Sequence, residues 1–230
     1  MSAGAKIAET FISVQGEGRL TGTPSWFVRF SGCNLRCAWC DTPYASWSPE
    51  GSNRSIPSLL DEAHASGVRH AVVTGGEPML FDEAAALARS LRAQGLHVTI
   101  ETAGTVWREI DADLMSISPK LANSTPAAES GWRGRHDARR INLDALQRLI
   151  DAHPQRQLKF VVAEPADLDE IETLLERLRR WAPEDVMLMP EGVTPEAMEA
   201  RDWIDAACAE RGWRPCPRLH ILLFGNTRGT

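Results

Sequence analysis

Three cysteines within eight residues constrain this chain more than any other feature of its sequence. Cys33, Cys37 and Cys40 follow a C-x3-C-x2-C spacing, and the two remaining cysteines, Cys208 and Cys216, lie far downstream. Iron–sulfur clusters are normally held by four thiolates, and a structural zinc site closes its tetrahedron with paired short spacings. Three thiolates without a local fourth therefore favour a four-iron cluster that keeps one iron open.

The thiols also fit two plainer interpretations, which stay open at this point. They are compatible with three ordinary cysteines, or with a zinc knuckle that a distant residue completes. The open-iron interpretation is favoured because an iron with a vacant site invites a bidentate ligand. The amino and carboxylate groups of S-adenosylmethionine (SAM) form such a ligand.

The residues around the thiols resemble the cluster loop of radical SAM enzymes. That loop runs from Cys33 to Thr42, with Trp39 at the aromatic position before the third cysteine. Further motifs, taken in order, resemble the 7-carboxy-7-deazaguanine synthases, the ring-contracting enzymes of queuosine and other 7-deazapurine pathways. These motifs are ISVQGEG at 12–18, Arg29, Asp41-Thr42, TGGEP at 74–78, SPK at 118–120 and RLH at 218–220. The resemblance covers nearly the whole chain.

The resemblance implies a reaction and its cofactors. The reaction converts 6-carboxy-5,6,7,8-tetrahydropterin to 7-carboxy-7-deazaguanine with loss of ammonia, so the enzyme is a carbon–nitrogen lyase. A 4Fe–4S cluster held by Cys33, Cys37 and Cys40 binds SAM on its fourth iron. SAM is regenerated as a true cofactor, and the family also uses Mg²⁺. An electron donor such as flavodoxin or ferredoxin and a homodimer are implied as partners.

The same resemblance implies roles for individual residues. The implied SAM contacts are Trp39, Cys40, Asp41, Gly76, Glu77, Ser118, Pro119, Lys120, Met189, Pro190, Glu191 and Gly192. The implied substrate contacts are Val14, Gln15, Gly16, Glu17, Arg29 and Thr74. Thr42 is the implied Mg²⁺ ligand. No residue is assigned as a general acid or base, because the reactive radical comes from SAM.

Elementary chemistry agrees with several of these roles. Arg29 offers a planar bidentate donor for the substrate carboxylate, although an arginine at the end of a strand is more commonly paired with an acid. Mg²⁺ prefers oxygen ligands and keeps several waters, which suits the hydroxyl of Thr42; without the resemblance, that residue is typical of a helix cap. Gly75 and Gly76 let the backbone approach a ligand closely, but a Gly-Gly pair is also typical of a plain turn.

Composition and charge exclude several other classes of protein. At 230 residues and 43% hydrophobic content, the chain is long enough to bury one sizeable core. A formal charge of −6 argues against a nucleic-acid-binding surface. No apolar run has the form of a signal peptide or the length of a membrane span. An odd number of cysteines, three of them crowded into one loop, indicates a reducing compartment, so we expect a cytoplasmic protein.

Short apolar runs alternate with helical patterns, which predicts βα units and a parallel sheet. We expect strands at 25–30, 70–74, 96–101, 114–118, 158–163, 186–189 and 220–223. We expect helices at 58–66, 82–94, 143–152, 167–181 and 195–211. These are too few units for an eight-fold barrel, so the prediction is an α/β fold, a partial or modified (β/α) TIM-like barrel of the radical SAM type. The motifs follow predicted strands, where such barrels carry their active sites.

We expect one domain over residues 1–230, with the cluster loop at 33–40 and a variable insertion at about 121–141. Segment 131–140 concentrates four arginines in an otherwise acidic protein, and we interpret it as a solvated loop. His220, on the last predicted strand, is compatible with a place at the substrate or with a structural role.

Two other functions remain as alternatives. A different small radical SAM enzyme, such as an activase that installs a glycyl radical on a partner protein, would share the cysteine loop and the GGEP motif. It would have no need of Gln15, Glu17, Arg29 and Thr42 as a pterin and magnesium site. A non-catalytic iron–sulfur redox protein is the third possibility, but it has little use for an open iron or for glycine-rich loops.

Overall fold

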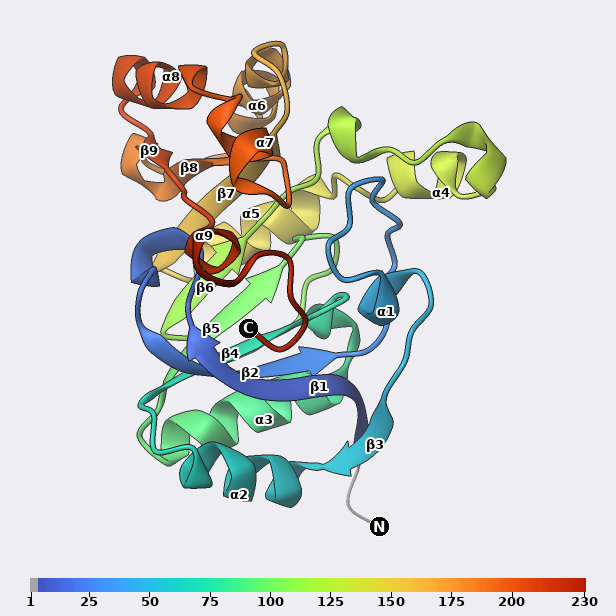
Figure 1. Ribbon diagram of the computed structural model, residues 1–230, viewed down its shortest axis with the longest axis vertical. Helices are drawn as coiled ribbons and strands as arrows, with labels where there is room; N and C mark the ends of the chain where they lie inside the picture. The colour runs from blue at the N-terminus through green and yellow to red at the C-terminus, as the bar shows by residue number, and fades with distance from the viewer. Residues whose placement is uncertain (1–3) are drawn as a thin grey trace.

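Nine strands form one sheet in the computed structural model, which describes residues 4–230 (Figure 1). The strands are β1 (Gly4–Val14), β2 (Pro24–Phe30), β3 (Ser52–Ser55), β4 (His70–Gly75), β5 (His97–Thr102), β6 (Leu114–Ile117), β7 (Arg156–Val162), β8 (Val186–Pro190) and β9 (Arg214–Pro215). Their order is β3-β1-β2-β4-β5-β6-β7-β8-β9. The seven strands from β2 to β9 in this order are parallel, whereas β1 runs antiparallel to both of its neighbours. The sheet is open in the described residues, as expected for a partial barrel.

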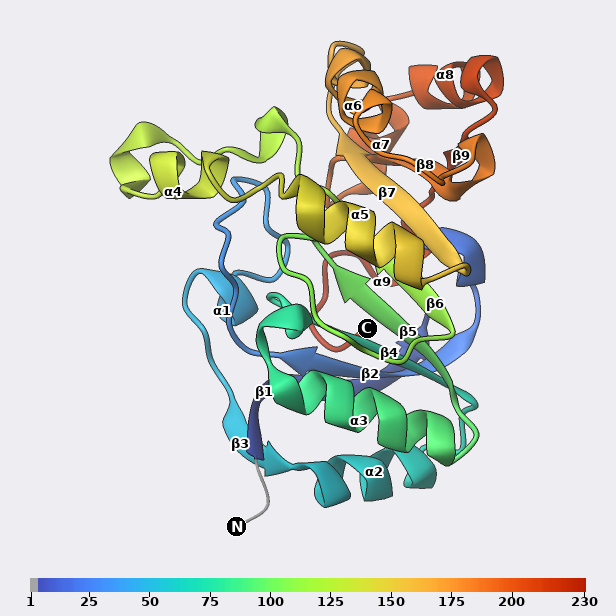
Figure 2. The ribbon, with the colours of Figure 1, turned by 180° about the vertical axis from the view of Figure 1, so that it is seen from behind.

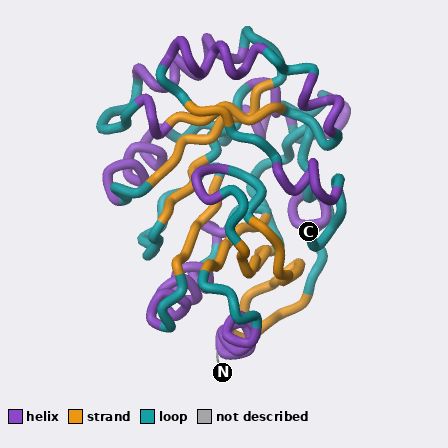
Figure 3. The backbone as a smooth tube through the Cα atoms, turned by 60° about the vertical axis from the view of Figure 1, so that its left-hand side comes forward, coloured by secondary structure: helices purple, strands orange, loops and turns teal. Residues whose placement is uncertain are grey.

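Helices connect the parallel strands. They are α1 (Pro43–Ser46), α2 (Ile56–Ala65), α3 (Asp82–Ala93), α4 (Arg133–Asp137), α5 (Leu143–Ala152), α6 (Asp167–Glu176), α7 (Pro195–Glu199), α8 (Trp203–Arg211) and α9 (Leu219–Phe224). Viewed from behind, α2, α3 and α5 lie across the back of the sheet (Figure 2). The sheet curves, with most of the helices along its outer side (Figure 3). None of the helices within residues 4–230 combines the length and the apolar character that crossing a membrane requires.

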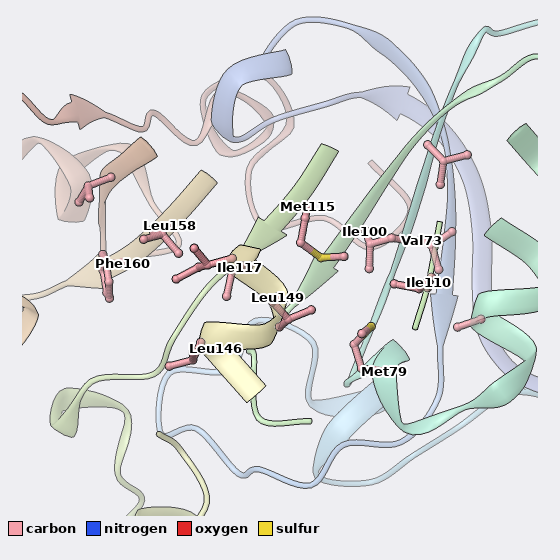
Figure 4. Close-up of a cluster of buried hydrophobic side chains, with 14 of the residues drawn as sticks. Val73, Met79, Ile100, Ile110, Met115, Ile117, Leu146, Leu149, Leu158 and Phe160 are labelled. Atoms are coloured by element: carbon pink, nitrogen blue, oxygen red, sulfur yellow. The ribbon is translucent and has the colours of Figure 1, made fainter. Parts of the chain in front are cut away.

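Helix α5 illustrates how the outer layer forms. The side chain of Asn142 accepts a hydrogen bond from the Ala145 N–H (3.2 Å), which caps the first turn of the helix. Leu146, Leu149 and Ile150 recur at three- and four-residue steps and are fully buried. They pack against residues from the strands in one continuous hydrophobic core (Figure 4). Burying each such side chain stabilises the fold by about 1.5–3 kcal/mol.

The two faces of the parallel strands carry different side chains. One face is apolar and packs on the helices; it includes Val73, Ile100 and Phe160. Because side chains alternate along a strand, the intervening positions point to the other face. That inner face carries Arg29 on β2, Thr74 on β4, Glu101 on β5, Ser116 on β6 and Lys159 on β7, and all five line one cavity. The alternation thus builds a core on one side and a site on the other.

At the end where the parallel strands begin, which we call the base, a small polar cluster is buried. Ser25 Oγ lies 2.6 Å from His70 Nδ1, and His70 Nε2 lies 2.8 Å from Thr99 Oγ1. These three residues form the His70 cluster, and each is at most 3% exposed. Every polar side-chain atom in this cluster has a neutral hydrogen-bond partner, so burying the cluster costs little free energy.

The strand predictions at 25–30, 70–74, 96–101, 114–118, 158–163 and 186–189 are confirmed to within two residues. The helix predictions at 58–66, 82–94 and 143–152 are confirmed equally well. The strand predicted at 220–223 is wrong, because these residues lie in helix α9. A short apolar run does not by itself distinguish a strand from a helix.

Two predicted helices differ from those observed. The helix predicted at 167–181 ends at Glu176, and the chain turns soon afterwards, where Arg180 adopts a positive φ of 65°. The helix predicted at 195–211 is interrupted at 200–202, which separates α7 from α8. Arg201, in the interruption, pairs with Glu191 at 2.6 Å and so holds α7 close to the end of β8. Strand β1 was not predicted, since residues 12–18 carried only a motif.

Candidate active site

A cavity of about 690 Å³ opens where the parallel strands end. Its lining includes all three clustered cysteines, Cys33, Cys37 and Cys40. It also includes all six expected substrate contacts, Val14, Gln15, Gly16, Glu17, Arg29 and Thr74, together with Thr42. Of the expected SAM contacts it includes Trp39, Cys40, Asp41, Gly76, Ser118, Lys120, Met189 and Glu191. Residues from segments as far apart in the sequence as Val14 and Glu191 therefore meet at one site.

The cluster loop is held by its backbone and by apolar packing. Leu35 is 1% exposed and packs with Cys37 and Ala103. The guanidinium of Arg36 donates to the carbonyls of Cys33 (2.8 Å) and Leu35 (2.7 Å). These contacts fix the curve of the loop while the three thiols remain free to face the cavity.

The thiol side chains suit a cluster with several iron atoms. Within residues 4–230, no three His, Cys, Asp or Glu side chains converge closely enough to hold a single metal ion. Cys33, Cys37 and Cys40 instead line one cavity wall, beside Leu35 and Ala103. Burial raises the pKa of both Cys33 and Cys37 to about 12. Thiolate ligands at these positions thus need the positive charge of bound iron, and the donor set fits a 4Fe–4S cluster with one open iron.

The glycine pair after β4 is required by close backbone contacts. Gly75 has a φ of +153°, a conformation that favours glycine. A Cβ on Gly76 would lie only 2.2 Å from the Gly32 carbonyl oxygen and 2.5 Å from that of Ala45. This pair is therefore more than an ordinary turn, since it lets the end of β4 pack directly against the cluster loop.

Glu77, expected at SAM, does not line the cavity. It is fully buried, and its carboxylate accepts hydrogen bonds from the Thr102 hydroxyl (2.8 Å), the Met79 N–H (3.0 Å) and the Ala103 N–H (2.8 Å). Burial raises the pKa of Glu77 despite these donors. The side chain fixes the end of β4 to the end of β5. Pro119, Pro190 and Gly192 likewise lie outside the lining.

A cationic corner lies between the cluster loop and β6. Lys120 Nζ donates to Ser118 Oγ (2.8 Å) and lies 5.6 Å from the centre of the Trp39 ring. The indole N–H of Trp39 in turn donates to the carbonyl oxygen of Asn123 at 3.1 Å. Cation, hydroxyl and aromatic face are arranged to receive an anionic or aromatic part of a ligand.

Arg29 occupies the other wall of the cavity. Its Nε donates to Glu9 Oε1 at 2.7 Å, and the Tyr44 hydroxyl donates to the same oxygen at 2.7 Å. No hydrogen bond of the two terminal nitrogens is found in the described part of the chain. Glu9 therefore orients the guanidinium by one edge and leaves its fork for a carboxylate.

Four side chains far apart in the sequence gather at the back of the cavity. Glu17 forms ion pairs with Lys159 and with Arg218 Nε (3.1 Å), and His220 Nε2 lies 4.0 Å from its carboxylate. We call Glu17, Lys159, Arg218 and His220 the Glu17 cluster. Burial alone raises the pKa of Glu17, but Lys159 and Arg218 outweigh it and hold the pKa well below its usual range. Burial lowers the pKa of Lys159, which its Coulombic pairing with Glu17 nevertheless raises above the ordinary value.

Thr42 lies at the cap position of α1, yet its side chain makes no capping hydrogen bond. Its hydroxyl lies 3.9 Å from Cys40 Sγ and lines the cavity. A hydroxyl beside the thiols whose hydrogen-bond contact is this long one to sulfur fits the donor chemistry of Mg²⁺, with the remaining ligands supplied by water or substrate.

Sequence reasoning assigned no role in the site to Glu101, Lys159 or Arg218, although Arg218 belongs to the RLH motif at 218–220. Gln15 Nε2 donates to Glu101 Oε1 at 3.1 Å, which places Glu101 within the cavity wall. Glu101 follows Ile100 within β5, and Lys159 stands between Leu158 and Phe160 within β7. Charged side chains are rarely buried without a partner, so this pattern was a usable signal.

The C-terminal residues 226–230 also line the cavity. Arg228 donates to Glu9 (3.1 Å) and to Glu50 (3.0 Å), and its guanidinium lies 4.0 Å from the centre of the Tyr44 ring. These contacts hold the tail across the cavity mouth, beside Arg29.

Comparison with known proteins identifies relatives over almost the full chain. Residues 27–152 match the model of the radical SAM superfamily. A 7-carboxy-7-deazaguanine synthase from Rhodopirellula baltica is 48% identical over 227 residues, which cover 97% of this chain and 88% of the relative. A protein of the same name from Halobacterium salinarum is 46% identical, with 97% and 92% coverage.

One solved structure agrees with these relatives in fold. The crystal structure of QueE from Escherichia coli superposes with a TM-score of 0.71 and 27% sequence identity. The match covers 94% of this chain and 95% of that one.

Proposed function

Because this chain belongs to the 7-carboxy-7-deazaguanine synthase family of radical SAM enzymes, we propose that its cavity converts 6-carboxy-5,6,7,8-tetrahydropterin to 7-carboxy-7-deazaguanine. Substrate and product differ by one ammonia, so the conversion is a lyase reaction that needs no net oxidant. The observation that carries the proposal is that one cavity contains the three thiols and all six expected substrate contacts. A glycyl-radical activase would have no use for this second group of residues.

Family membership implies a 4Fe–4S cluster and SAM. We propose that Cys33, Cys37 and Cys40 hold the cluster. Together, cluster and SAM supply, after one-electron reduction, the radical that removes a hydrogen atom from the substrate. The chain positions SAM through the backbone at Gly76 and the cationic corner of Lys120, Ser118 and Trp39. Met189 and Glu191 form the cavity wall beside the adenosine of SAM. Glu77 acts indirectly, by fixing the end of β4 to the end of β5.

The substrate has two ends of different chemistry, and the cavity offers a matching group for each. The fork of Arg29, oriented by Glu9, is suited to the carboxylate of the pterin. Backbone groups at 14–16 and the carboxylate of Glu17 are suited to the N–H-rich edge of the pterin ring. Thr74 on β4 is the register partner of Arg29 on the neighbouring strand β2, and it lines the same cavity. Contacts at both ends of the substrate fix its orientation and thereby determine which carbon–hydrogen bond faces SAM.

Magnesium is a further part of the proposal. The hydroxyl of Thr42 makes no capping hydrogen bond, and it lies between the thiols and the wall with Arg29. We propose that it binds Mg²⁺ together with the substrate carboxylate and water, and so helps to orient the substrate.

The electron for SAM reduction must come from another protein, for which we propose a flavodoxin or a ferredoxin. Arg133, Arg135 and Arg139 are exposed on the segment around α4 and have no ion pair in the described chain, whose net charge is −6. His136 links this segment to the cluster loop by accepting from the Arg36 N–H at 3.2 Å. An acidic donor protein would thus meet a basic surface close to the cluster.

We also propose a cytoplasmic homodimer. Leu222, Leu223 and Phe224 of α9 are between 45% and 55% exposed, and Ile12 of β1 is 54% exposed. Exposed apolar side chains of this size are suited to an interface between subunits. Size-exclusion chromatography of Leu223→Glu, compared with the unaltered chain, tests this interface through a shift from dimer to monomer.

The proposed reaction is tested by anaerobic turnover. Reconstituted protein is incubated with 6-carboxytetrahydropterin, SAM, a strong reductant and Mg²⁺, and the products are followed by mass spectrometry. We expect 7-carboxy-7-deazaguanine to accumulate with multiple turnovers per SAM. Cleavage of SAM without this product would keep the superfamily assignment but remove the proposed substrate.

A further inference from the structure

Arg218 joins three separate loops of the cavity. It directly precedes α9 and is 5% exposed. Its Nε donates to Glu17 Oε1 (3.1 Å), one terminal nitrogen donates to the Gly192 carbonyl oxygen (2.5 Å), and the other donates to Asp41 Oδ2 (2.5 Å). One guanidinium thus holds the loop after β1, the loop after β8 and the end of the cluster loop.

These three loops serve different ligands under the proposed function, on which this inference rests. Asp41 follows the third thiol, and Gly192 ends the segment expected at the adenosine of SAM. Glu17 belongs to the substrate side. Arg218 itself is absent from the cavity lining, so it contacts these loops from behind.

We propose that Arg218 is a positioning residue that couples the binding of SAM to the binding of the pterin substrate. SAM orders the segments at Asp41 and Gly192, which fixes the plane of the guanidinium and with it the carboxylate of Glu17. Substrate bound against Glu17 fixes the same guanidinium from the other side. When one ligand has already ordered these loops, the second ligand binds without the entropic cost of ordering them, so it binds more tightly.

The choice of arginine is informative. A guanidinium offers five N–H donors in a rigid plane, whereas the ammonium of lysine is a single point charge. Each of the three acceptors meets a different nitrogen of the guanidinium, whereas a lysine would have to reach all three from a single nitrogen. Lys159 already supplies a second positive charge to Glu17, so neutralising that carboxylate does not by itself require Arg218.

Coupling between two sites is reciprocal and is measured as a ratio of affinities. We expect the pterin to tighten SAM binding by roughly tenfold in the unaltered enzyme, a typical size for such coupling. In Arg218→Lys each ligand still binds, but the ratio of SAM dissociation constants with and without pterin falls close to one. The yield of 5′-deoxyadenosine per molecule of product rises in parallel, because SAM cleavage no longer depends on a positioned substrate.

The experiment uses the anaerobically reconstituted full chain and equilibrium dialysis of SAM, with and without 6-carboxytetrahydropterin. Arg211→Lys is the matched control: this partly buried arginine pairs with Glu172 and Glu210 away from the cavity, and the coupling ratio of the variant stays unchanged. Asp41→Ala removes one branch only, by deleting a carboxylate whose side chain is 42% exposed, and the same loss of coupling is expected without risk to folding.

If the role of Arg218 were purely structural, Arg218→Lys would weaken the binding of both ligands and leave the ratio of SAM dissociation constants with and without pterin unchanged. An unchanged ratio in Arg218→Lys or in Asp41→Ala overturns the inference, as does a ratio of one in the unaltered enzyme. The proposed function fails separately, if the unaltered enzyme makes no product from this pterin. Product formation with unaltered coupling in the variants would refute only the role of Arg218.

Discussion

Two buried polar clusters, one at each end of the parallel strands, are stabilised in opposite ways. Where the strands end, a region that includes the whole cavity and that we call the mouth, the Glu17 cluster buries several charged groups that only their mutual pairing makes tolerable. At the base, the His70 cluster buries neutral groups that satisfy one another by hydrogen bonds. Burial lowers the pKa of His70 to about 4, assisted by His97, and Asp113 opposes this shift only in part. The His70 cluster is thus neutral at physiological pH.

The difference indicates what each end is for. Replacing a buried ion pair with well-packed apolar residues often leaves stability unchanged or improves it, so buried charge is weak evidence for a stabilising role. Charge at the mouth therefore indicates binding and chemistry, whereas the neutral hydrogen bonds at the base indicate stability. Substitutions at the mouth are expected to reduce activity more than stability, and substitutions at the base to do the reverse.

The largest expected effect at the mouth comes from the thiols. Cys37→Ala removes one of three ligands, so the cluster is lost and SAM cleavage falls to background. Iron content and the visible absorbance of reconstituted protein measure this loss. Cys208→Ala is the control, because Cys208 is buried in α8, away from the cavity; it keeps full iron content. Iron retained in Cys37→Ala would remove this residue from the ligand set.

A single methyl group provides the next test. Gly76→Ala places a Cβ within 2.2 Å of the Gly32 carbonyl oxygen, so the loop must shift away from the cluster. Overpacking of this kind costs about 1–3 kcal/mol, and we expect SAM affinity to fall by a comparable free energy. In Gly134→Ala the new methyl meets no atom within 4 Å, and SAM affinity is unchanged. Equal affinities of the two variants for SAM would contradict the close approach of this loop to the ligand.

Arg29 separates substrate binding from SAM cleavage. In Arg29→Ala the substrate carboxylate loses its bidentate partner. We expect kcat/KM for the pterin to fall by an amount that corresponds to a loss of about 2–5 kcal/mol of transition-state stabilisation. SAM cleavage without product remains measurable, since the thiols are untouched. Arg54→Ala removes a half-exposed arginine on β3 and serves as the control. Normal turnover by Arg29→Ala would exclude Arg29 from the substrate site.

Thr42→Ala is expected to act more weakly, on the metal alone. Loss of the hydroxyl raises the Mg²⁺ concentration required for half-maximal turnover by about tenfold, of the order of one lost metal ligand. The absorbance of the cluster stays the same. An unaltered Mg²⁺ dependence would remove Thr42 from the metal site.

The sequence predicted the residues at the mouth wherever a local sequence pattern specifies them. The thiols at 33–40, the glycines after β4 and six of the nine strands follow from spacing and periodicity within short windows. The Glu17 cluster joins residues 17, 159, 218 and 220, and no local pattern specifies which distant cation meets which carboxylate. Helix α9 was mistaken for a strand for a related reason: its apolar residues 222–224 face outward, so the usual burial pattern is missing.

The smallest effect is expected at the base, and it concerns stability and pH. In the folded state the pKa of His70 is about 4, below the ordinary 6.5 of the unfolded chain. As the pH falls from 6.5 to 4, the unfolded chain takes up a proton that the folded chain excludes, so the contribution of His70 to stability is lost over this range. It is fully present above pH 6.5 and changes no further below pH 4.

His70→Gln makes this contribution measurable, because glutamine keeps donor and acceptor groups but does not titrate. At pH 7 we expect the variant to be about 1–3 kcal/mol less stable, from imperfect hydrogen bonds to Ser25 and Thr99. The difference from the unaltered protein should narrow as the pH falls toward 4, as measured by urea unfolding of the cluster-free chain. Turnover by the reconstituted variant at pH 7 should stay close to normal. A variant with normal stability but impaired turnover would reverse the assignment of the two ends, because it would give the base a catalytic role.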